Sequence, residues 1–344
     1  MASAKDIALK AFRGEKTDYI PVGIFLGGSW PIINSGLTLE GLIGEVEKTA
    51  KVFFDVNKKL NADIIITGVG STALMIKALG GEVKFDKKGA PQIISQLIKN
   101  EGDLRSLSVS TVTKDGSMIW LRDTAKELLK LSRGEKLILA SGRAPFTLAT
   151  QMYGLENFSK AMYKNRTFAH EILEFTTKLS IEYFETMIDE GRVDGAFIAD
   201  QTASGDVISK KHFEEFVLPY FTRVVRSVKN LNKPVMLHIC GNISDRLKLI
   251  SETGIDCLSI DTKVDIAKAM EAIGDKTCIA GNVDPVDVLE LGTRSAVIEA
   301  TDECLRKGTA KGGGFILLPG CDPAGGVPEE NITAFVDTAH QWKS

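Results

Sequence analysis

The chain has 344 residues, 44% hydrophobic and 25% charged, a balance typical of a folded globular protein rather than a disordered or fibrous one. Lysine and arginine number 42 and aspartate and glutamate 45, so the formal net charge is −3, which argues against nucleic acid or an anionic membrane surface as a partner. The uncharged stretch 19–39 is rich in glycine and proline and therefore predicts a buried strand and a loop rather than a bilayer span.

Short, nearly continuous apolar runs recur along the chain, and most are followed by a segment with helical periodicity. They cover eight ranges, 20–25, 62–68, 137–142, 195–200, 234–240, 257–261, 277–282 and 315–321. Continuous rather than alternating hydrophobicity is typical of parallel strands that are covered on both faces. Eight such units predict an α/β fold, the TIM (β/α)8 barrel, with a doubly wound open sheet as the alternative.

The gap between the second and third runs is too long for one helix. Within this gap, the pair Asp115-Gly116 lies between short β-prone runs, which is a hairpin signal. We therefore expect a small β-hairpin insertion between strands two and three, over roughly residues 80–122. No linker rich in proline or serine divides the chain, so residues 1–344 are expected to form a single TIM-barrel domain.

The cysteines argue against a disulfide framework, because their number is odd and they cluster late in the chain. They are Cys240, Cys257, Cys278, Cys304 and Cys321. The N-terminal segment is polar and does not have the pattern of a secretory signal. We therefore expect a reduced, cytoplasmic protein, in which Cys257, Cys278 and Cys304 belong to the core.

Functional side chains of a β/α barrel lie at the C-terminal ends of its strands. His238 and Cys240 are two residues apart in the fifth run, so strand geometry points both side chains to the same face. Cys321 ends the eighth run. One imidazole and two thiolates predict a zinc site with three protein ligands and an open fourth position, as in catalytic zinc sites. Ordinary buried cysteines are the alternative interpretation.

Two acidic residues, Asp200 and Asp261, end the fourth and sixth runs and are candidate catalytic residues. Either is placed to support a metal ligand, and Asp261 is also a candidate for the open metal position. Trp30 and Phe146, in loops after the first and third runs, and Asn282, at the end of the seventh, are candidate substrate-binding residues. Helix capping, loop hydrogen bonds and core packing are the alternative roles.

A resemblance to a known family is carried by the segments HICGNISDRLKLISETGIDCLSID, AGNVDPVDVL and LLPGCDPAGGVPEENI, with support from FRGEKTDYIPVG and APFTLATQMYG. These segments are similar to the uroporphyrinogen decarboxylase superfamily, and more narrowly to its zinc-dependent corrinoid methyltransferases. The resemblance runs from about residue 5 to residue 342. It implies a TIM barrel and assigns the metal to His238, Cys240 and Cys321.

The chain departs from the true decarboxylases of this superfamily. Their first-strand loop carries a motif of the form MRQAGRY, in which an arginine binds the carboxylates of the substrate. The corresponding stretch here is FLGGSWPIINSG, which contains no arginine. The arginine that would bind a polycarboxylate substrate is therefore missing from this stretch. A decarboxylase of the uroporphyrinogen decarboxylase type is disfavoured for this reason.

The resemblance implies an enzyme that moves a methyl group between a small substrate and the cobalt of a corrinoid (cobalamin) carried by a partner protein. A methoxylated aromatic donor, and hence O-demethylation, is favoured because the first-strand loop and the aromatic pocket candidates are neutral. A thiol such as coenzyme M is the alternative, and Arg143 would then supply a cation for its sulfonate. A further alternative is a non-enzymatic protein that binds a corrinoid protein and holds a structural zinc. The sequence leaves open whether the chain forms a homo-oligomer.

Overall fold

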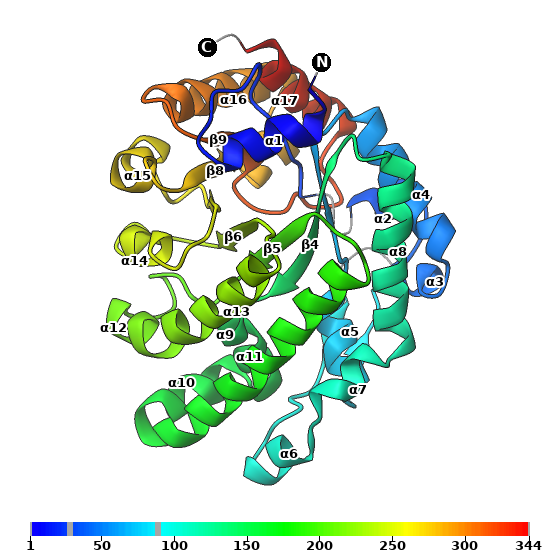
Figure 1. The fold of residues 1–344 in the computed structure, drawn as a ribbon, viewed down its shortest axis with the longest axis vertical. Helices are drawn as coiled ribbons and strands as arrows, with labels where there is room; N and C mark the ends of the chain where they lie inside the picture. The colour runs from blue at the N-terminus through cyan, green and yellow to red at the C-terminus, as the bar shows by residue number, and fades with distance from the viewer. Residues whose placement is uncertain (1, 26–29, 87–90, 343–344) are drawn as a thin grey trace.

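The computed structural model of the chain describes residues 2–25, 30–86 and 91–342 and shows one curved sheet of parallel strands with helices on its outside (Figure 1). The strands are, in their order across the sheet, β1 (Ile64–Thr67), β4 (Leu137–Arg143), β5 (Gly195–Ala199), β6 (Val235–Ile239), β7 (Cys257–Ile260), β8 (Cys278–Val283) and β9 (Phe315–Pro319). Their order across the sheet is their order along the chain, as a β/α barrel requires.

The first predicted run closes the barrel between β9 and β1. Val22 bridges in parallel to Leu317 of β9, and Gly23 bridges to Ile64 of β1. The Gly23 amide donates to the carbonyl of Leu317 at 3.1 Å, and the Asp63 amide donates to the carbonyl of Val22 at 2.8 Å. All eight predicted runs therefore take part in the barrel, and the open doubly wound sheet is excluded.

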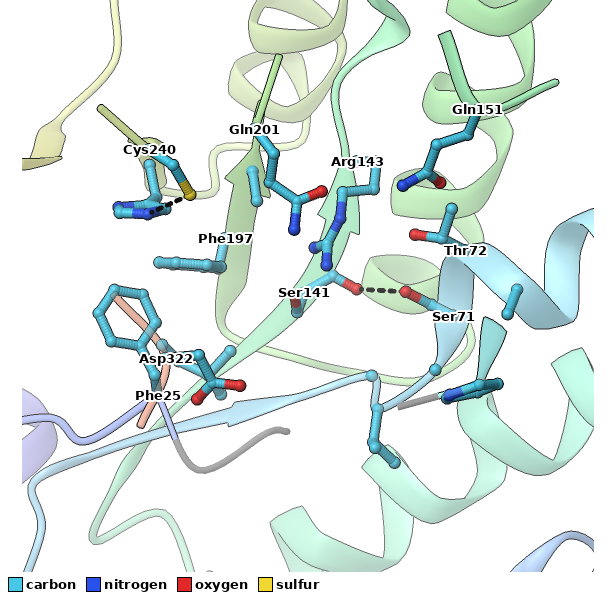
Figure 2. A pocket seen from close by; sticks show the side chains of 18 of the residues that line it. Phe25, Ser71, Thr72, Ser141, Arg143, Gln151, Phe197, Gln201, Cys240 and Asp322 are labelled. Atoms are coloured by element: carbon cyan, nitrogen blue, oxygen red, sulfur yellow. Dashed lines mark hydrogen bonds between the residues drawn. The ribbon is translucent and has the colours of Figure 1, made fainter. Parts of the chain in front are cut away.

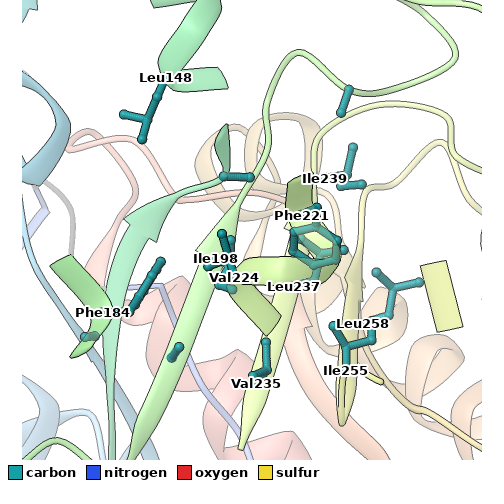
Figure 3. Packing of buried hydrophobic residues seen from close by; sticks show 14 of the residues in the cluster. Leu148, Phe184, Ile198, Phe221, Val224, Val235, Leu237, Ile239, Ile255 and Leu258 are labelled. Atoms are coloured by element: carbon teal, nitrogen blue, oxygen red, sulfur yellow. The ribbon is translucent and has the colours of Figure 1, made fainter. Parts of the chain in front are cut away.

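The side chains of each strand lie alternately in two hydrophobic layers, because successive side chains of a strand point to opposite faces of the sheet. The layer inside the barrel includes Ile64, Leu139, Phe197, Met236 and Leu318. The layer between the strands and the outer helices includes Ile198, Val235, Leu237, Ile239 and Leu258, which Figure 3 shows. Both faces of the sheet are thus apolar, which explains the continuous hydrophobic runs in the sequence.

The helices surround the sheet, and no described helix combines the length and the apolar character that crossing a membrane requires. They are α1 (Ala4–Phe12), α2 (Trp30–Asn34), α3 (Leu39–Leu42), α4 (Val46–Lys59), α5 (Ser71–Ala78), α6 (Glu101–Ser106), α7 (Val109–Thr113), α8 (Gly116–Ser132), α9 (Pro145–Tyr153), α10 (Leu155–Lys164), α11 (Arg166–Asp189), α12 (Lys210–His212), α13 (Leu218–Asn230), α14 (Leu247–Ser251), α15 (Ile266–Ile273), α16 (Arg294–Thr309) and α17 (Glu329–Gln341), with π-helical turns at Phe213–Val217 and Pro285–Glu290.

Helix α1 covers the end of the barrel at which the strands begin. The Lys5 amide donates at 2.9 Å to the carbonyl of Glu135, just before β4, and the Lys5 ammonium pairs at 2.5 Å with Asp194, just before β5. Ala8, Ala11 and Phe12 of α1 join the layer inside the barrel. This end of the barrel is therefore closed, and the end at which the strands finish is the accessible one.

The region between β1 and β4 contains a small antiparallel pair, β2 (Val83–Lys84) and β3 (Gln92–Ile93), as the sequence predicts. The connecting residues 87–90 lie outside the described residues. The hairpin expected at Asp115-Gly116 is wrong. Asp115 instead caps α8, since its carboxylate accepts a hydrogen bond from the Ser117 amide at 2.8 Å. Aspartate before glycine suits a helix N-cap as well as a turn, so the local signal is ambiguous.

Candidate metal centre and cavity

The structure brings His238, Cys240 and Cys321 together at the open end of the barrel. His238 lies on β6, two residues after the inward-pointing Met236, and Cys240 follows two residues later. Cys321 comes from the loop after β9. His238 Nε2 lies 3.2 Å from Cys240 Sγ, the two sulfurs are 3.7 Å apart, and the three ligand atoms all lie within 4.8 Å of one another.

These separations fit a tetrahedral zinc ion. Bonds of about 2.3 Å to sulfur and about 2.0 Å to nitrogen, at tetrahedral angles, place two sulfurs about 3.8 Å apart and a nitrogen about 3.5 Å from a sulfur. The sulfur separation of 3.7 Å is close to that value and far above the ~2.05 Å of a disulfide. Among the described residues the cluster has three members, which leaves one position of a four-coordinate ion for another ligand.

A hydrogen bond between the two thiols separates their pKa values. The two thiols share a hydrogen bond, which lowers the pKa of Cys321 and raises that of Cys240, and His238 lowers the pKa of Cys321 further. His238 Nδ1 lies 3.1 Å from the Ser259 hydroxyl, so a proton on Nδ1 would leave Nε2 to bind a metal. Cys321 therefore ionises first, and thiolate is the form that binds zinc.

Asp261 supports the segment that carries Cys240. One carboxylate oxygen accepts a hydrogen bond from the Gly241 amide at 2.8 Å, and the other accepts from the Lys263 amide at 3.0 Å. Gly241 has a φ of +87°, and a Cβ added there would lie 2.6 Å from the Asp206 carboxylate. Asp261 is not a member of the three-residue cluster. Its contacts are those of a positioning residue for Cys240.

We expect Asp261→Ala to weaken zinc affinity about 10- to 100-fold, because the Gly241 amide loses the acceptor that orients the adjacent ligand. The affinity is measured by competition with a chromogenic chelator. Asp55→Ala, which removes an exposed carboxylate on α4, is the matched control and should bind zinc like the unaltered chain. Unchanged affinity in Asp261→Ala would contradict the positioning role.

Asp200, the other acidic candidate, lies outside the metal cluster and is 1% exposed. Its Oδ1 accepts hydrogen bonds from the Thr147 hydroxyl at 2.6 Å and the Thr147 amide at 3.2 Å, while Oδ2 has no partner among the described residues. Burial raises the pKa of Asp200 to about 7. Asp200 therefore connects the end of β5 to the start of α9 and is not a lining residue of the cavity described next.

A cavity of about 300 Å³ opens beside the metal cluster, and all three cluster residues line it (Figure 2). Phe25 and Phe197 form an aromatic wall next to His238, with ring centroids 5.3 Å and 6.3 Å from that of the imidazole. The polar lining residues include Thr72, Arg143, Gln151, Gln201 and Asp322. A cavity of this volume, lined by both apolar and polar side chains, is of a size that suits a small-molecule ligand.

The three predicted substrate-binding residues are absent from this lining. The Trp30 indole donates to the carbonyl of Val327 at 2.9 Å, and Phe146 is 1% exposed in the core. The Asn282 amide donates to two carbonyls of the segment after β7, at 2.9 Å and 2.8 Å. These contacts match the alternative roles of packing and loop support. Two lining residues, Phe25 and Gln151, were not among the predicted site residues. The inward direction of Phe25 could have been predicted from the alternation of side chains along the first run, whereas no feature of the sequence indicates the position of Gln151.

Arg246 links the loops beside the cluster and is 1% exposed. Its guanidinium donates to the carbonyl of Ala203 at 2.8 Å and to that of Ile208 at 3.1 Å, and lies 4.9 Å from the ring centroid of Phe213. These partners belong to the segment after β5, whereas Arg246 follows Cys240 by six positions. The side chain therefore joins the segments after β5 and β6, both of which border the open end of the barrel.

Comparison with known proteins gives a consistent result. The model of the uroporphyrinogen decarboxylase (URO-D) family matches residues 3–342. Similar proteins include the methylcobamide:CoM methyltransferase MtbA of Methanosarcina acetivorans, 30% identical over 98% of each chain, and the methylated-thiol–coenzyme M methyltransferase of Methanosarcina mazei, 28% identical over 96% of this chain and 87% of the relative. A solved methyltransferase from Methanosarcina mazei shares the fold, with a TM-score of 0.88, 24% identity and 98% coverage of each chain.

Proposed function

The chain belongs to the uroporphyrinogen decarboxylase (URO-D) family, and from that membership we propose that it is a zinc-dependent methyltransferase acting between a small substrate and the cobalt of a corrinoid (cobalamin) on a partner protein. The observation that carries the proposal is the convergence of His238, Cys240 and Cys321 on one side of a cavity at the open end of the barrel. The family's decarboxylation reaction is disfavoured, because the first-strand stretch has no arginine to bind several carboxylates.

Zinc held by the three residues would supply a Lewis acid, which lowers the pKa of a thiol or polarises an ether oxygen. The protein's own contribution is mainly positioning, which can account for a large share of the rate of a displacement reaction. The rings of Phe25 and Phe197 lie against the His238 imidazole and make that side of the cavity apolar. Asp261 and Arg246 hold the segment that carries Cys240.

Two substrate classes are compatible with this site. A methoxylated aromatic donor, favoured by the sequence, suits the aromatic wall of Phe25 and Phe197. A thiol acceptor suits Arg143 in the same cavity, and two of the similar proteins are named for coenzyme M. We place the thiol first, because the named relatives act on that class, and keep the aryl methyl ether second.

The test begins with metal content by plasma mass spectrometry on protein purified without chelator, and we expect about one zinc per chain. The zinc-loaded chain is then incubated with methylcobalamin and a panel of thiols, and separately with reduced cobalamin and a panel of methoxyarenes. Methylated thiol or demethylated phenol, formed only with the zinc-loaded chain, supports the proposal. No transfer in either panel, with zinc bound and the fold intact, contradicts it.

A further inference from the structure

A second cavity, of about 390 Å³, adjoins the cavity beside the metal cluster, and we refer to it as the rim groove. Its lining comes from the segment around β3 and from α9, and consists of Pro91, Ile93, Ile94, Ser95, Gln96 and Gln151. Three of these residues, Pro91, Ile93 and Gln151, also line the cavity beside the metal cluster. The two spaces are therefore continuous, and a ligand held in the first has room to extend into the second.

The rim groove lies away from the metal cluster. None of the three cluster residues is among its lining residues. Figure 2 shows Gln151, which borders both spaces, on the opposite side of the cavity lining from Cys240. A molecule whose reacting end lies at the cluster would therefore direct its far end toward the groove.

The wall of the rim groove is held in place by hydrogen bonds to the neighbouring helices. The Ile98 amide donates at 3.0 Å to the carbonyl of Met152 on α9, and the side-chain amide of Asn157 on α10 donates at 3.0 Å to Oε1 of Gln96. Gln96 also packs directly on Gly154, where an added Cβ would collide with its side-chain amide. The groove is thus formed before any ligand binds, which reduces the entropy cost of binding.

The lining of the rim groove suits an uncharged chain. Half of the lining residues are apolar, the others carry an amide or a hydroxyl, and none of those described is charged. Ile93 packs against the core, whereas the adjacent Ile94 is 58% exposed. An apolar chain that covers Ile94 would remove this surface from water, and a hydroxyl at the end of the chain could exchange hydrogen bonds with the amides.

We propose that the rim groove binds the far end of the small substrate, and that this end is an uncharged, largely apolar chain. The substrate is then a thiol or an ether that is longer than the cavity beside the metal cluster. The inference rests on the proposed function only for the reacting end, which would lie at His238, Cys240 and Cys321. Ile94 becomes a residue that determines specificity for chain length.

The test measures binding apart from methyl transfer. Uncharged mercapto-alcohols with three, six and eight carbons are titrated calorimetrically, without oxygen, into the zinc-loaded chain. Guaiacol with a methyl or a hexyl group para to its hydroxyl forms a second series for the ether class. A fully buried methylene is worth about fourfold in affinity, and one covered on a single side about twofold. We therefore expect the eight-carbon thiol to bind about 10- to 30-fold more tightly than the three-carbon thiol.

Substitutions at Ile94 separate the groove from the rest of the cavity. Ile94→Asp places a charge on the apolar wall and should reduce the ratio of the two affinities to below about threefold, whereas Ile94→Val should keep most of it. The fold should tolerate both changes because Ile94 is largely exposed. Leu291→Asp is the matched control and should keep the full ratio, since Leu291 is 73% exposed and lines neither space.

Equal affinities along both series in the unaltered chain would overturn the proposal. A length dependence that survives Ile94→Asp would also overturn it, because the chain would then lie elsewhere and the groove would be left to a macromolecule. Length-dependent binding that requires Ile94, in a chain without methyl transfer, would count against the proposed function alone. Methyl transfer without any length dependence would count against the groove alone.

Discussion

Cys321→Ala is expected to lose bound zinc and to lower kcat/KM for methyl transfer by about 10³-fold or more. Two remaining ligands, His238 and Cys240, hold zinc far less tightly than three, and Cys321 is the thiol that ionises first. A Lewis acid contributes several kcal/mol to catalysis, and each 1.36 kcal/mol is a factor of ten in rate, so about 10³-fold is the expected scale. The fold should persist, because Cys321 lies in a loop and is only partly buried.

The measurement pairs zinc content with a methyl-transfer assay and a thermal melt. Cys240→Ala should behave like Cys321→Ala, since both remove a member of the cluster. Cys304→Ala is the matched control, because Cys304 is also partly buried but lies on α16 outside the cluster. A metal-free Cys321→Ala protein with full activity would show that zinc takes no part in the reaction.

Arg246→Ala is expected to lower the free energy of unfolding by about 3–5 kcal/mol. The substitution leaves the carbonyls of Ala203 and Ile208 without their donor in the protein interior, at about 1–3 kcal/mol each, and removes the guanidinium from the Phe213 ring. The ion pair with Asp245 adds little, because the Asp245 side chain is 51% exposed. Arg246→Lys should recover only part of the loss, since an ammonium does not reproduce the planar fork.

Urea unfolding followed by circular dichroism measures this effect. Arg226→Ala, which removes an exposed arginine from α13, is the control and should change the free energy of unfolding by less than about 0.5 kcal/mol. Zinc content is measured in the same samples, because Arg246 holds the segment that follows Cys240. A loss of less than about 1 kcal/mol in Arg246→Ala would mean that the two carbonyls find other partners.

The metal cluster could be predicted from the sequence because it depends on regular geometry. A spacing of two residues on a strand places His238 and Cys240 on one face, and parallel strands finish at the same end of a barrel, which brings Cys321 to the same place. The barrel itself follows from the eight apolar runs. Even the weakly paired first run was identifiable, because hydrophobicity reflects burial rather than the number of ladder hydrogen bonds.

Side chains in loops and on helices were harder to place. Trp30 and Phe146 were expected in loops but lie on α2 and α9, and Asn282 lies near the end of β8. Each of the three turns to a packing or hydrogen-bonding partner instead of the cavity. Gln151 reaches the cavity from α9, and its position depends on how that helix packs against the barrel. The role of Arg246 requires two carbonyls from another segment. Tertiary contacts of this kind leave no periodic signal in one sequence.

The closure of one barrel end by α1 has a kinetic consequence. Gly314 lies directly against α1, where an added Cβ would collide with the carbonyl of Ala11. Among the described residues, the cavity beside the metal cluster lies at the opposite end of the barrel, where the strands finish. A small molecule deep in the cavity must enter before a macromolecule covers the open end of the barrel. It can leave only after that macromolecule has dissociated. Exchange of the small reactant should therefore slow as the concentration of a rim-covering macromolecule rises.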